Sequence, residues 1–437
     1  MRKVQKSTAK LLHTAPESQK PSPDGGIESV RTCRFCAAPL VESFVDLGTM
    51  PPANYYLWPG ELGVAELFYP LHSYVCGDCH LVQIEKVQTP EQLFSYYAYF
   101  SSYSDSWLSH AERYTDEMIA RFGFGSHSQV VEIASNDGYL LQYFKAKGIP
   151  VLGVEPAVNV AEIAEQKGIP TLVRFFGTET AKVMAADGAQ ADLLIGNNVL
   201  AHVPDINDFV AGLKLALKPQ GVLTMEFPHL LKLIELNQFD TIYHEHFSYF
   251  SFLTAERIFA HHGLMLFDVE ELETHGGSLR IFACHEGQDI AASENVERLR
   301  SREITAGLND MATYNGFADK VKRIKRMFLT FLIEAKEQGK SVVGYGAPAK
   351  GNTLLNYCGI RGDFIDYTVD ASPHKQGLHL PGTHIPVYAP DKIFETRPDY
   401  VLILPWNLKD EIMEKMSAIR LWGGKFVVPI PEVKVYD

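Results

Sequence analysis

Short apolar runs alternate with amphipathic stretches through the middle of the chain. Five runs have the length and apolar content of buried strands, at residues 129–134, 150–155, 171–175, 191–196 and 221–226. Between them, residues 157–167 and 206–218 repeat apolar positions at helical spacing. Strands and helices that alternate in this order predict a doubly wound α/β sheet.

The alternation resumes in the last third of the chain. Residues 341–346 and 365–370 have the pattern of strands, and the first runs through a Gly-x-Gly turn into a helical start near Lys350. Such a unit is typical of a second Rossmann-like half, and Lys350 beside a helix N-terminus favours a phosphate there. Residues 317–338, rich in Lys and Arg, are predicted to form a linking helix, and Asp370 to act as a cap or turn residue.

Length and charge limit the classes of function. The chain has 437 residues, which suggests two or three domains. Its net charge of -13 argues against a general affinity for nucleic acid or anionic membranes, but not against a local basic pocket for a phosphorylated small molecule. No apolar run approaches the length of a membrane span and the N-terminus lacks a signal peptide pattern, so a cytoplasmic location is expected. Residues 1–30 are predicted to form a mobile tail.

Four of the six cysteines form two Cys-x-x-Cys pairs, Cys33 with Cys36 and Cys76 with Cys79. Four thiolates in this spacing predict a tetrahedral structural zinc site with no open coordination position. Two disulfides fit poorly with a chain that lacks an export signal, and a redox pair would normally occur once, beside a βαβ unit. The other two cysteines are expected to be core residues.

A nucleotide-binding corner is predicted after the strand at 129–134. The strand runs into a turn of small and polar residues that ends at Gly138, and then into a helix. Glu155, at the end of the next strand, is placed to accept the hydroxyls of a ribose. The turn lacks the Gly-x-Gly-x-x-Gly of dinucleotide sites and carries Glu132, Asn136 and Asp137, which favours S-adenosylmethionine over a dinucleotide. An α/β domain without a cofactor is the remaining alternative.

The sequence Tyr243-His244-Glu245-His246 places a phenol, two imidazoles and a carboxylate within four residues, after the apolar strand at 221–226. The pKa values of these groups lie near neutral pH or can be moved toward it by burial. The cluster is therefore a candidate site of proton transfer. A hydrogen-bonded polar turn is the simpler alternative. His244 and His246 are two residues apart and would diverge on a helix, which makes zinc protease chemistry a poor fit.

Several motifs occur together in the order of a known family. Besides the paired cysteines, they lie at residues 97–104, 132–138, 153–156, 196–202, 226–229, 243–246 and 344–351. In combination they resemble the three-domain sugar C-methyltransferase family, whose members place a methyl branch at C-3 of nucleotide-linked 4-keto-deoxysugars. The resemblance extends from about Cys33 to the C-terminus. One difference is Ala134, where the family's small turn has glycine.

The resemblance implies a domain order. It predicts a zinc-binding domain at residues 31–90, a class I methyltransferase domain with a Rossmann-like sheet at 91–315, and a Rossmann-like substrate-binding domain at 316–437. It further implies S-adenosylmethionine as cofactor, S-adenosylhomocysteine as product, structural zinc, and a nucleotide-linked sugar, with dTDP the expected nucleotide. We expect a monomer.

The resemblance also implies roles for individual residues. Tyr243, Glu245 and His246 correspond to the catalytic group, with Asn198 and His202 beside the reacting sugar. The cofactor contacts it implies are Tyr97, Ser101, Glu132, Asn136, Asp137, Gly138, Glu155 and Asn197, and the substrate contacts are His229, Tyr345, Gly346, Lys350 and Asn352.

The chemistry gives these roles a reason. A methyl sulfonium needs an electron-rich acceptor, and a sugar carbon becomes one only when a base removes the proton beside a ketone. We expect His246 to remove the C-3 proton, because histidine needs little pKa adjustment for this task. Tyr243, or another hydroxyl or amide, would stabilise the enolate oxygen, and Glu245 would orient the imidazole or bind a substrate substituent.

Three other hypotheses remain open on the sequence alone. The Gly-x-Gly turn after residue 343 is compatible with an NAD(P)-dependent sugar-nucleotide oxidoreductase. A zinc-bearing protein that binds sugar nucleotides without catalysis is the second. An O-methyltransferase is the third, and it would not need to remove a proton from carbon.

Overall fold

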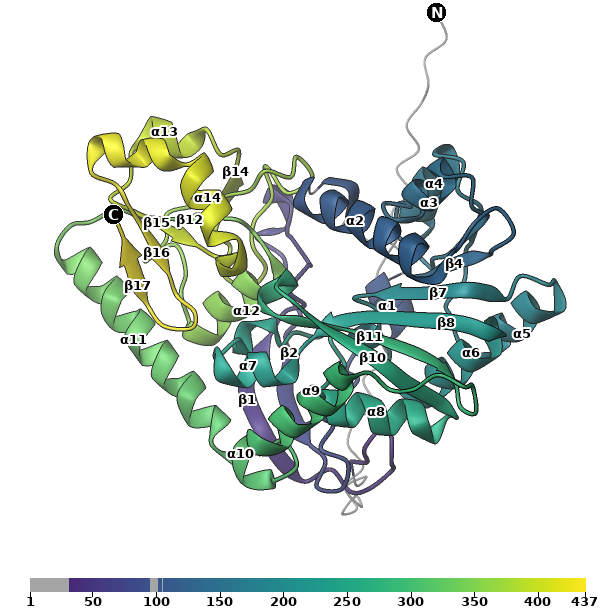
Figure 1. Cartoon of the computed structure of the whole chain (residues 1–437). Coiled ribbons are helices and arrows are strands. Elements are labelled where there is room, and N and C mark those ends of the chain that lie inside the picture. Colours follow the sequence, from purple (N-terminus) through teal and green to yellow (C-terminus); the bar gives the residue numbers. More distant parts are fainter. Residues whose placement is uncertain (1–30, 95–100, 104) are drawn as a thin grey trace, which may run out of the picture.

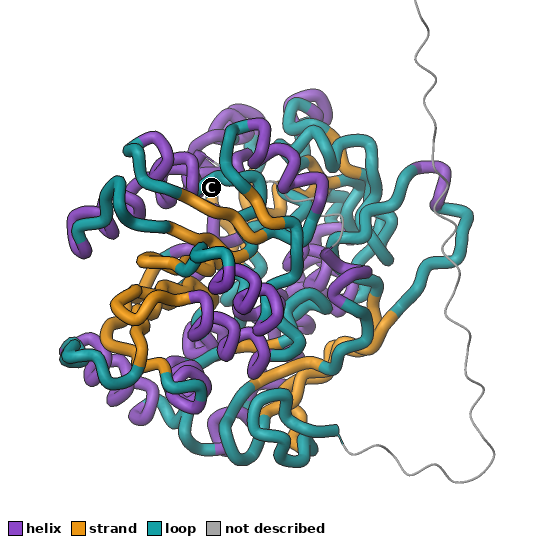
Figure 2. The backbone as a smooth tube through the Cα atoms, turned by 90° about the vertical axis from the view of Figure 1, so that its right-hand side faces the viewer, coloured by secondary structure: helices purple, strands orange, loops and turns teal. Residues whose placement is uncertain are grey.

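The computed structural model describes residues 31–94, 101–103 and 105–437 (Figure 1). The tail predicted for residues 1–30 and the predicted cofactor contact Tyr97 lie outside the described residues. Three sheets organise the rest: a four-stranded sheet near the paired cysteines, a seven-stranded central sheet and a six-stranded C-terminal sheet. Figure 2 shows strands bordered by helices, the layering expected of an α/β protein.

The central sheet has the strand order β10-β11-β8-β7-β4-β5-β6. Its strands are β4 (Val130–Ile133), β5 (Val151–Val154), β6 (Thr171–Leu172), β7 (Ala191–Asn197), β8 (Leu217–Pro228), β10 (Leu264–Leu272) and β11 (Ser278–His285). The strands from β6 to β8 are parallel, whereas β11 is antiparallel to both neighbours. The doubly wound Rossmann-like sheet predicted from the apolar runs is therefore confirmed.

Helices cover both faces of this sheet. One face packs against α2 (Asp105–Phe122), α3 (Leu141–Ala146) and α4 (Val158–Gln166). The other packs against α5 (Thr178–Ala186), α6 (Ile206–Ala216), α8 (Phe252–His261) and α9 (Glu294–Thr305). Within the described ranges, no helix is both long enough and apolar enough to cross a membrane.

The C-terminal sheet has the order β14-β13-β12-β15-β16-β17 and confirms the second Rossmann-like unit. Its strands are β12 (Val342–Tyr345), β13 (Thr368–Val369), β14 (Val387–Tyr388), β15 (Tyr400–Ile403), β16 (Lys425–Val428) and β17 (Lys434–Tyr436). All are parallel except β17. Its helices are α12 (Ala349–Cys358), α13 (Lys392–Thr396) and α14 (Lys409–Lys415), and α11 (Phe317–Glu337) is the predicted linking helix.

Two predicted strands are shorter than expected. The run 171–175 pairs only at β6, because β6 is an edge strand and residues 173–175 turn outward into solvent. The run 365–370 pairs only at β13. The cluster at 243–246 also does not follow β8 directly, since α7 (Leu230–Glu235) and the 3-10 helix η4 (Phe239–Thr241) intervene.

The four-stranded sheet joins two distant parts of the sequence. Its order is β1-β2-β3-β9, with β1 (Glu42–Met50), β2 (Tyr69–Val75) and β3 (Val82–Ile84) near the paired cysteines. The fourth strand, β9 (Ser248–Tyr249), begins two residues after His246 and pairs antiparallel with β3. The paired cysteines and strands β1 to β3 are called the cysteine domain below. The predicted proton-transfer loop, residues 243–246, is thus continuous with the sheet of this domain. The remaining short helices are α1 (Pro90–Phe94) and α10 (Met311–Asn315).

The cysteine domain shares its apolar core with both other units. One cluster of buried side chains runs from β1 through α11 to the C-terminal sheet, and Phe44 of β1 stacks on Phe317 of α11 with ring centroids 4.5 Å apart. A second cluster joins Cys33 and Cys79 to α6, α8 and one face of the central sheet. In Figure 1, β1 and β2 lie between α11 and the central sheet, so the domain acts as a wedge between the two larger units.

Truncating Phe44 tests this wedge. Phe44→Ala removes a buried ring from the shared core, and we expect a loss of about 3–5 kcal/mol in the free energy of unfolding, measured by urea denaturation. The matched control is Val41→Ala, at an exposed position next to β1, which should change stability by less than about 0.5 kcal/mol. Equal effects of the two substitutions would show that β1 contributes no shared core.

Candidate active site

A cavity of about 530 Å³ is lined by loops of both α/β sheets. On the central sheet, its wall includes Asn136 after β4, Glu155 after β5 and Asn197 at the end of β7. On the C-terminal sheet, it includes Pro348 and Lys350 after β12. The strand order reverses at β4 in one sheet and at β12 in the other, and ligands of doubly wound sheets bind outside the carboxyl ends at such points. One cavity therefore combines the binding crevices of two sheets.

Tyr243 and His246 form a hydrogen-bonded pair at this cavity. Nδ1 of His246 lies 3.0 Å from the carbonyl oxygen of Thr241, and because a carbonyl only accepts, this nitrogen carries the proton. Nε2 is then the acceptor of the Tyr243 hydroxyl, 2.8 Å away. The pair presents a phenol backed by a basic imidazole nitrogen.

Other histidines surround this pair. The rings of His202 and His246 meet edge to face, with centroids 4.7 Å apart, and His275 also lines the cavity. Burial, followed by the charge of His202, lowers the pKa of His246 well below its ordinary value. Burial also lowers the pKa values of His202 and His275 to about 4. His246 is therefore neutral and able to accept a proton, but it is a weaker base than the sequence led us to expect.

Glu245 does not line the cavity itself but contacts a residue that does. Its carboxylate is buried and accepts a hydrogen bond from Asn54 Nδ2 at 2.8 Å, and it is Asn54 that lines the cavity. The expectation that Glu245 orients the His246 imidazole is corrected, because Thr241 and Tyr243 hold that ring. Burial raises the pKa of Glu245 to about 7, while the Asn54 bond lowers it.

Backbone pairing fixes the position of the loop. Phe247, the residue after His246, donates its N–H to the carbonyl of Ala201 at 2.7 Å and accepts from Ile84 of β3 at 3.1 Å. His244 contacts the cysteine domain through Nε2, 3.2 Å from the carbonyl oxygen of Pro70. The loop is thereby held between the cysteine domain and the turn that carries His202.

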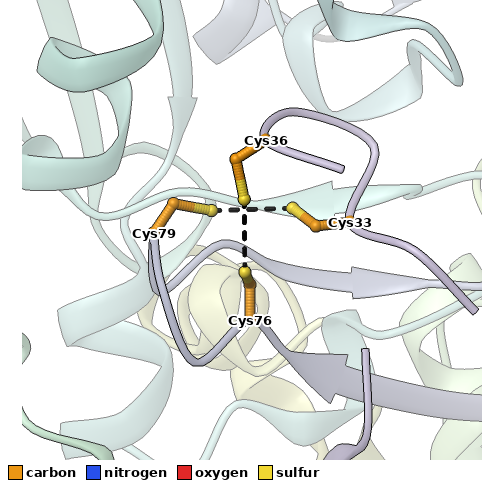
Figure 3. A group of neighbouring side chains, drawn as sticks. All are labelled: Cys33, Cys36, Cys76 and Cys79. Atoms are coloured by element: carbon orange, nitrogen blue, oxygen red, sulfur yellow. Dashed lines mark hydrogen bonds between the residues drawn. The ribbon is translucent and has the colours of Figure 1, made fainter. Parts of the chain in front are cut away.

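The four predicted zinc ligands converge (Figure 3). Their sulfur atoms all lie within 4.8 Å of one another, and the pairs Cys33–Cys79 and Cys36–Cys76 are each 3.5 Å apart. These separations exclude disulfides, whose S–S bond is about 2.05 Å, and approach the sulfur–sulfur edge of about 3.8 Å in a zinc tetrathiolate. The ligand set and its geometry therefore fit zinc.

Gln83 and Arg34 connect the cysteine cluster to the cavity. Gln83 donates from Nε2 to Cys33 Sγ at 3.2 Å and accepts from the Arg34 backbone N–H at 3.0 Å. The Arg34 guanidinium, at 5.5 Å from the Phe247 ring centroid, donates to the carbonyl of Pro204 at 3.1 Å. Pro204 lies two residues after His202 and Phe247 directly follows His246, so Arg34 contacts both of these loops.

Known proteins match the chain in the same three parts. A zinc binding domain family matches residues 33–94, a methyltransferase domain family matches 107–269, and a C-methyltransferase C-terminal domain family matches 273–431. C-methyltransferase NovU of Streptomyces niveus is 35% identical over 409 residues, which cover 94% of this chain and 97% of NovU. The chain belongs to the C-methyltransferase family.

Two further matches cover less of this C-methyltransferase. Ubiquinone biosynthesis O-methyltransferase of Bartonella tribocorum is 31% identical over 99 residues, or 22% of this chain and 39% of that protein. The solved structure of magnesium protoporphyrin IX methyltransferase (ChlM) from Synechocystis PCC 6803 with bound SAH has a TM-score of 0.34 and 15% identity, covering 41% of this chain and 83% of that one. S-adenosylmethionine is the methyl donor of the family, and the predicted zinc-binding domain is confirmed. The comparisons give the oxidoreductase alternative no support.

The turn after β4 fits an S-adenosylmethionine site. Glu155 lines the cavity, and its two carboxylate oxygens accept the N–H groups of Asn136 at 3.0 Å and Ala157 at 2.9 Å, which hold it in one orientation. Burial raises the pKa of Glu155 to about 7. The Oδ1 atom of Asn136 accepts the N–H of Ser101 at 3.0 Å, which places Ser101 at the cavity as well.

Backbone strain is concentrated at this cavity. Ala134, Asn136, Asn198 and His275 all have left-handed backbone with φ between 50° and 56°, and all four line the cavity. Left-handed backbone is unfavourable for residues with a Cβ and tends to occur at functional sites.

Three of the expected cofactor ligands do not line the cavity. Glu132 is a fully buried residue of β4, Asp137 accepts the N–H of Ser102 at 3.3 Å, and Gly138 packs so closely that a Cβ would lie 2.3 Å from Ile169 Cδ1. These three support the turn.

Four of the expected substrate ligands also lie outside the cavity lining. His229 is buried and its Nε2 lies 2.7 Å from Glu303 Oε1. Tyr345 is a core residue, Gly346 makes room for Pro405, and Asn352 donates to the carbonyl of Ala53 at 2.6 Å. Of the residues expected to meet the substrate from the C-terminal unit, Lys350 is the one that reaches the cavity.

Other residues that line the cavity were not predicted from the sequence. They are spread over the whole chain and include Asn54, Trp107, Tyr139, His275 and Lys375. His275 had one local signal, a histidine before two glycines in the loop that joins β10 to β11. The others sit in segments without a recognisable motif.

Replacing a zinc ligand should uncouple the loop from the cysteine domain. Cys76→Ser is expected to lower the zinc content from about one ion per chain and to lower the melting temperature, because binding free energy at such sites is folding free energy. Metal analysis and thermal unfolding measure both. The control, Cys358→Ser, removes a buried thiol far from the cluster in sequence and should retain zinc. Unchanged zinc content in Cys76→Ser would contradict the assignment.

Glu245 should make stability depend on pH. Its raised pKa means that the folded state binds the proton more tightly than the unfolded state, so stability falls as pH rises from about 4.5 to about 7. Glu245→Gln removes this loss, and its stability advantage over the wild type should grow by about 1 kcal/mol between pH 6 and pH 8. Urea denaturation at both values measures it, with the exposed Glu162→Gln as control. An advantage independent of pH would contradict the argument.

Proposed function

We propose that this enzyme transfers a methyl group from S-adenosylmethionine to C-3 of a nucleotide-linked 4-keto-deoxysugar. The observation that carries the proposal is the Tyr243–His246 pair in a cavity shared by the cofactor crevice and the C-terminal crevice. A base at that position can remove a proton from a substrate held by one sheet while the methyl donor is held by the other.

The composition of the cavity supports this class of substrate. The C-terminal unit contributes two cations to the cavity, Lys350 and Lys375, and a cavity with two positive groups suits a negatively charged substrate such as a nucleotide sugar. The central unit contributes Asn198, whose Nδ2 lies 3.2 Å from His275 Nε2 and which can also donate to a sugar oxygen. NovU, a C-methyltransferase, is the relative matched along nearly the whole chain.

The hydrogen-bond directions support one proton path. In place of the direct removal by His246 expected from the sequence, the Tyr243 oxygen takes the proton from C-3 while the phenol passes its own proton to His246 Nε2. The C–H electron pair forms the C-3 to C-4 double bond of an enolate, and the negative charge resides on the C-4 oxygen. When bound, S-adenosylmethionine supplies an electrophilic methyl group to C-3 and leaves as S-adenosylhomocysteine.

The protein favours this transfer by keeping His246 in one tautomer and in its neutral form. Thr241 fixes the Nδ1–H tautomer, so Nε2 always faces the phenol. The lowered pKa of His246 keeps it unprotonated at neutral pH, ready to accept. Negative charge that develops on the substrate then favours the imidazolium, because the two opposite charges form together in a buried site.

Proton exchange at C-3 tests the proposal without methyl transfer. The wild type, with S-adenosylhomocysteine bound, should exchange the C-3 hydrogen of a nucleotide-linked 4-keto-deoxysugar with deuterium from heavy water, measured by NMR. His246→Ala and Tyr243→Phe should each slow exchange about 100-fold or more. The exposed His127→Ala should exchange at the wild-type rate. A wild type that methylates the sugar without any exchange would refute the proton path.

A further inference from the structure

An enolate beside Tyr243 and His246 needs a positive group at its oxygen. The proton removed from C-3 leaves a full negative charge on the C-4 oxygen, and a donor placed in advance can stabilise it most strongly. The histidines near the pair are neutral because burial lowers their pKa values. A charged donor from another element would stabilise the oxygen more strongly than these neutral groups.

Lys350 is a cation held toward this site. Its Nζ donates to Asn407 Oδ1 at 2.7 Å and lies 4.4 Å from the Trp406 ring centroid. Trp406 is anchored in turn, since its Nε1–H donates to Asp240 Oδ2 at 2.7 Å. Asp240 belongs to η4, three residues before Tyr243. The chain from Lys350 through Trp406 and Asp240 fixes the ammonium relative to the proton-transfer pair.

Lys350 brings a positive charge to the cavity of the reacting groups. Its Nζ contacts a neutral amide and an aromatic face and forms no ion pair within the described part of the chain, and the nearby carboxylate is that of Asp240, which also holds Trp406. Lys350, His246 and His275 all line the same cavity. Lys350 is also the second residue of α12, so the positive end of that helix adds to its field.

We propose that Lys350 is a catalytic residue that binds the C-4 oxygen of the sugar and stabilises the enolate. This inference rests on the proposed function and extends it, because it assigns the oxygen-binding group that the Tyr243–His246 pair lacks. In the step, the ammonium donates a hydrogen bond to the C-4 oxygen throughout, and the proton from C-3 goes to the Tyr243–His246 pair.

The same burial that holds Lys350 suits it to this role. Burial lowers the pKa of Lys350 to about 8, while Asp240 raises it. An ammonium with a lowered pKa is a stronger hydrogen-bond donor, and the negative charge of an enolate that forms beside it offsets its positive charge.

Phosphate binding is the competing role for Lys350, and Lys375 is a second cation at the cavity that can fill that role. Lys375 lines the cavity from the loop after β13, next to Asp370, whose Oδ2 lies 3.8 Å from its Nζ. Tyr56 contacts the same ammonium through its ring, at 5.3 Å from the centroid. Its Nζ also donates to the carbonyl of Ala347 at 2.7 Å, so Lys375 is held by partners different from those of Lys350.

The test separates enolisation from binding. Lys350→Met is assayed for C-3 exchange in heavy water at saturating sugar nucleotide with S-adenosylhomocysteine present, and for the Kd of the sugar nucleotide by calorimetry. We expect exchange to slow about 100- to 1000-fold with a much smaller change in Kd, as for loss of one donor to a developing oxyanion. Lys322→Met, on the exposed face of α11, is the matched control and should behave as wild type.

Asn407→Ala provides a second variant that keeps the lysine. It removes the bond that orients Nζ and should slow exchange to a smaller extent than Lys350→Met. A raised Kd with an unchanged exchange rate at saturation in Lys350→Met would assign Lys350 to phosphate and overturn the inference, as would full exchange in Asn407→Ala. A wild type that neither exchanges nor methylates the sugar would overturn the proposed function, and the inference with it.

Discussion

The pairing of β9 with β3 is the constraint on which the rest of the active site depends. Each backbone hydrogen bond contributes only about 1 kcal/mol, but these bonds set the register of a strand that begins two residues after His246. The paired cysteines fix the turns next to β3, and Gln83 connects β3 to Cys33. The position of the Tyr243–His246 pair therefore follows from a domain that itself lines the cavity only with Asn54 and with residues of α1, namely Pro90, Glu91 and Phe94, among the described residues.

The wedge formed by that domain also explains how two Rossmann-like units share one cavity. Each doubly wound sheet binds ligands at the point where its strand order reverses. A core shared by β1, α11 and the C-terminal sheet holds that unit in place, while the cysteines pack against the central unit. The groups proposed for cofactor binding, proton transfer and anion binding thereby come from different parts of the chain and line one cavity.

Much of this architecture could be predicted from the sequence, because its signals are local. Apolar periodicity identified β4, β5, β7 and β8, and spacing identified the zinc ligands. Side-chain direction could not be predicted in the same way. His229 and Asn352 have the polar character of ligands but satisfy buried partners, whereas Asn54 and His275 reach the cavity through tertiary packing alone. The pairing of β9 with β3 joins segments more than 160 residues apart and leaves no periodic signal.

The position of the transferred methyl group tests the account most directly. The enzyme would be incubated with a nucleotide-linked 4-keto-deoxysugar and S-adenosylmethionine labelled with ¹³C in the methyl group, and the product examined by carbon–proton correlation NMR. The account predicts that the labelled methyl is bonded to C-3 of the sugar. A labelled methyl on oxygen, or on any other carbon, would contradict it.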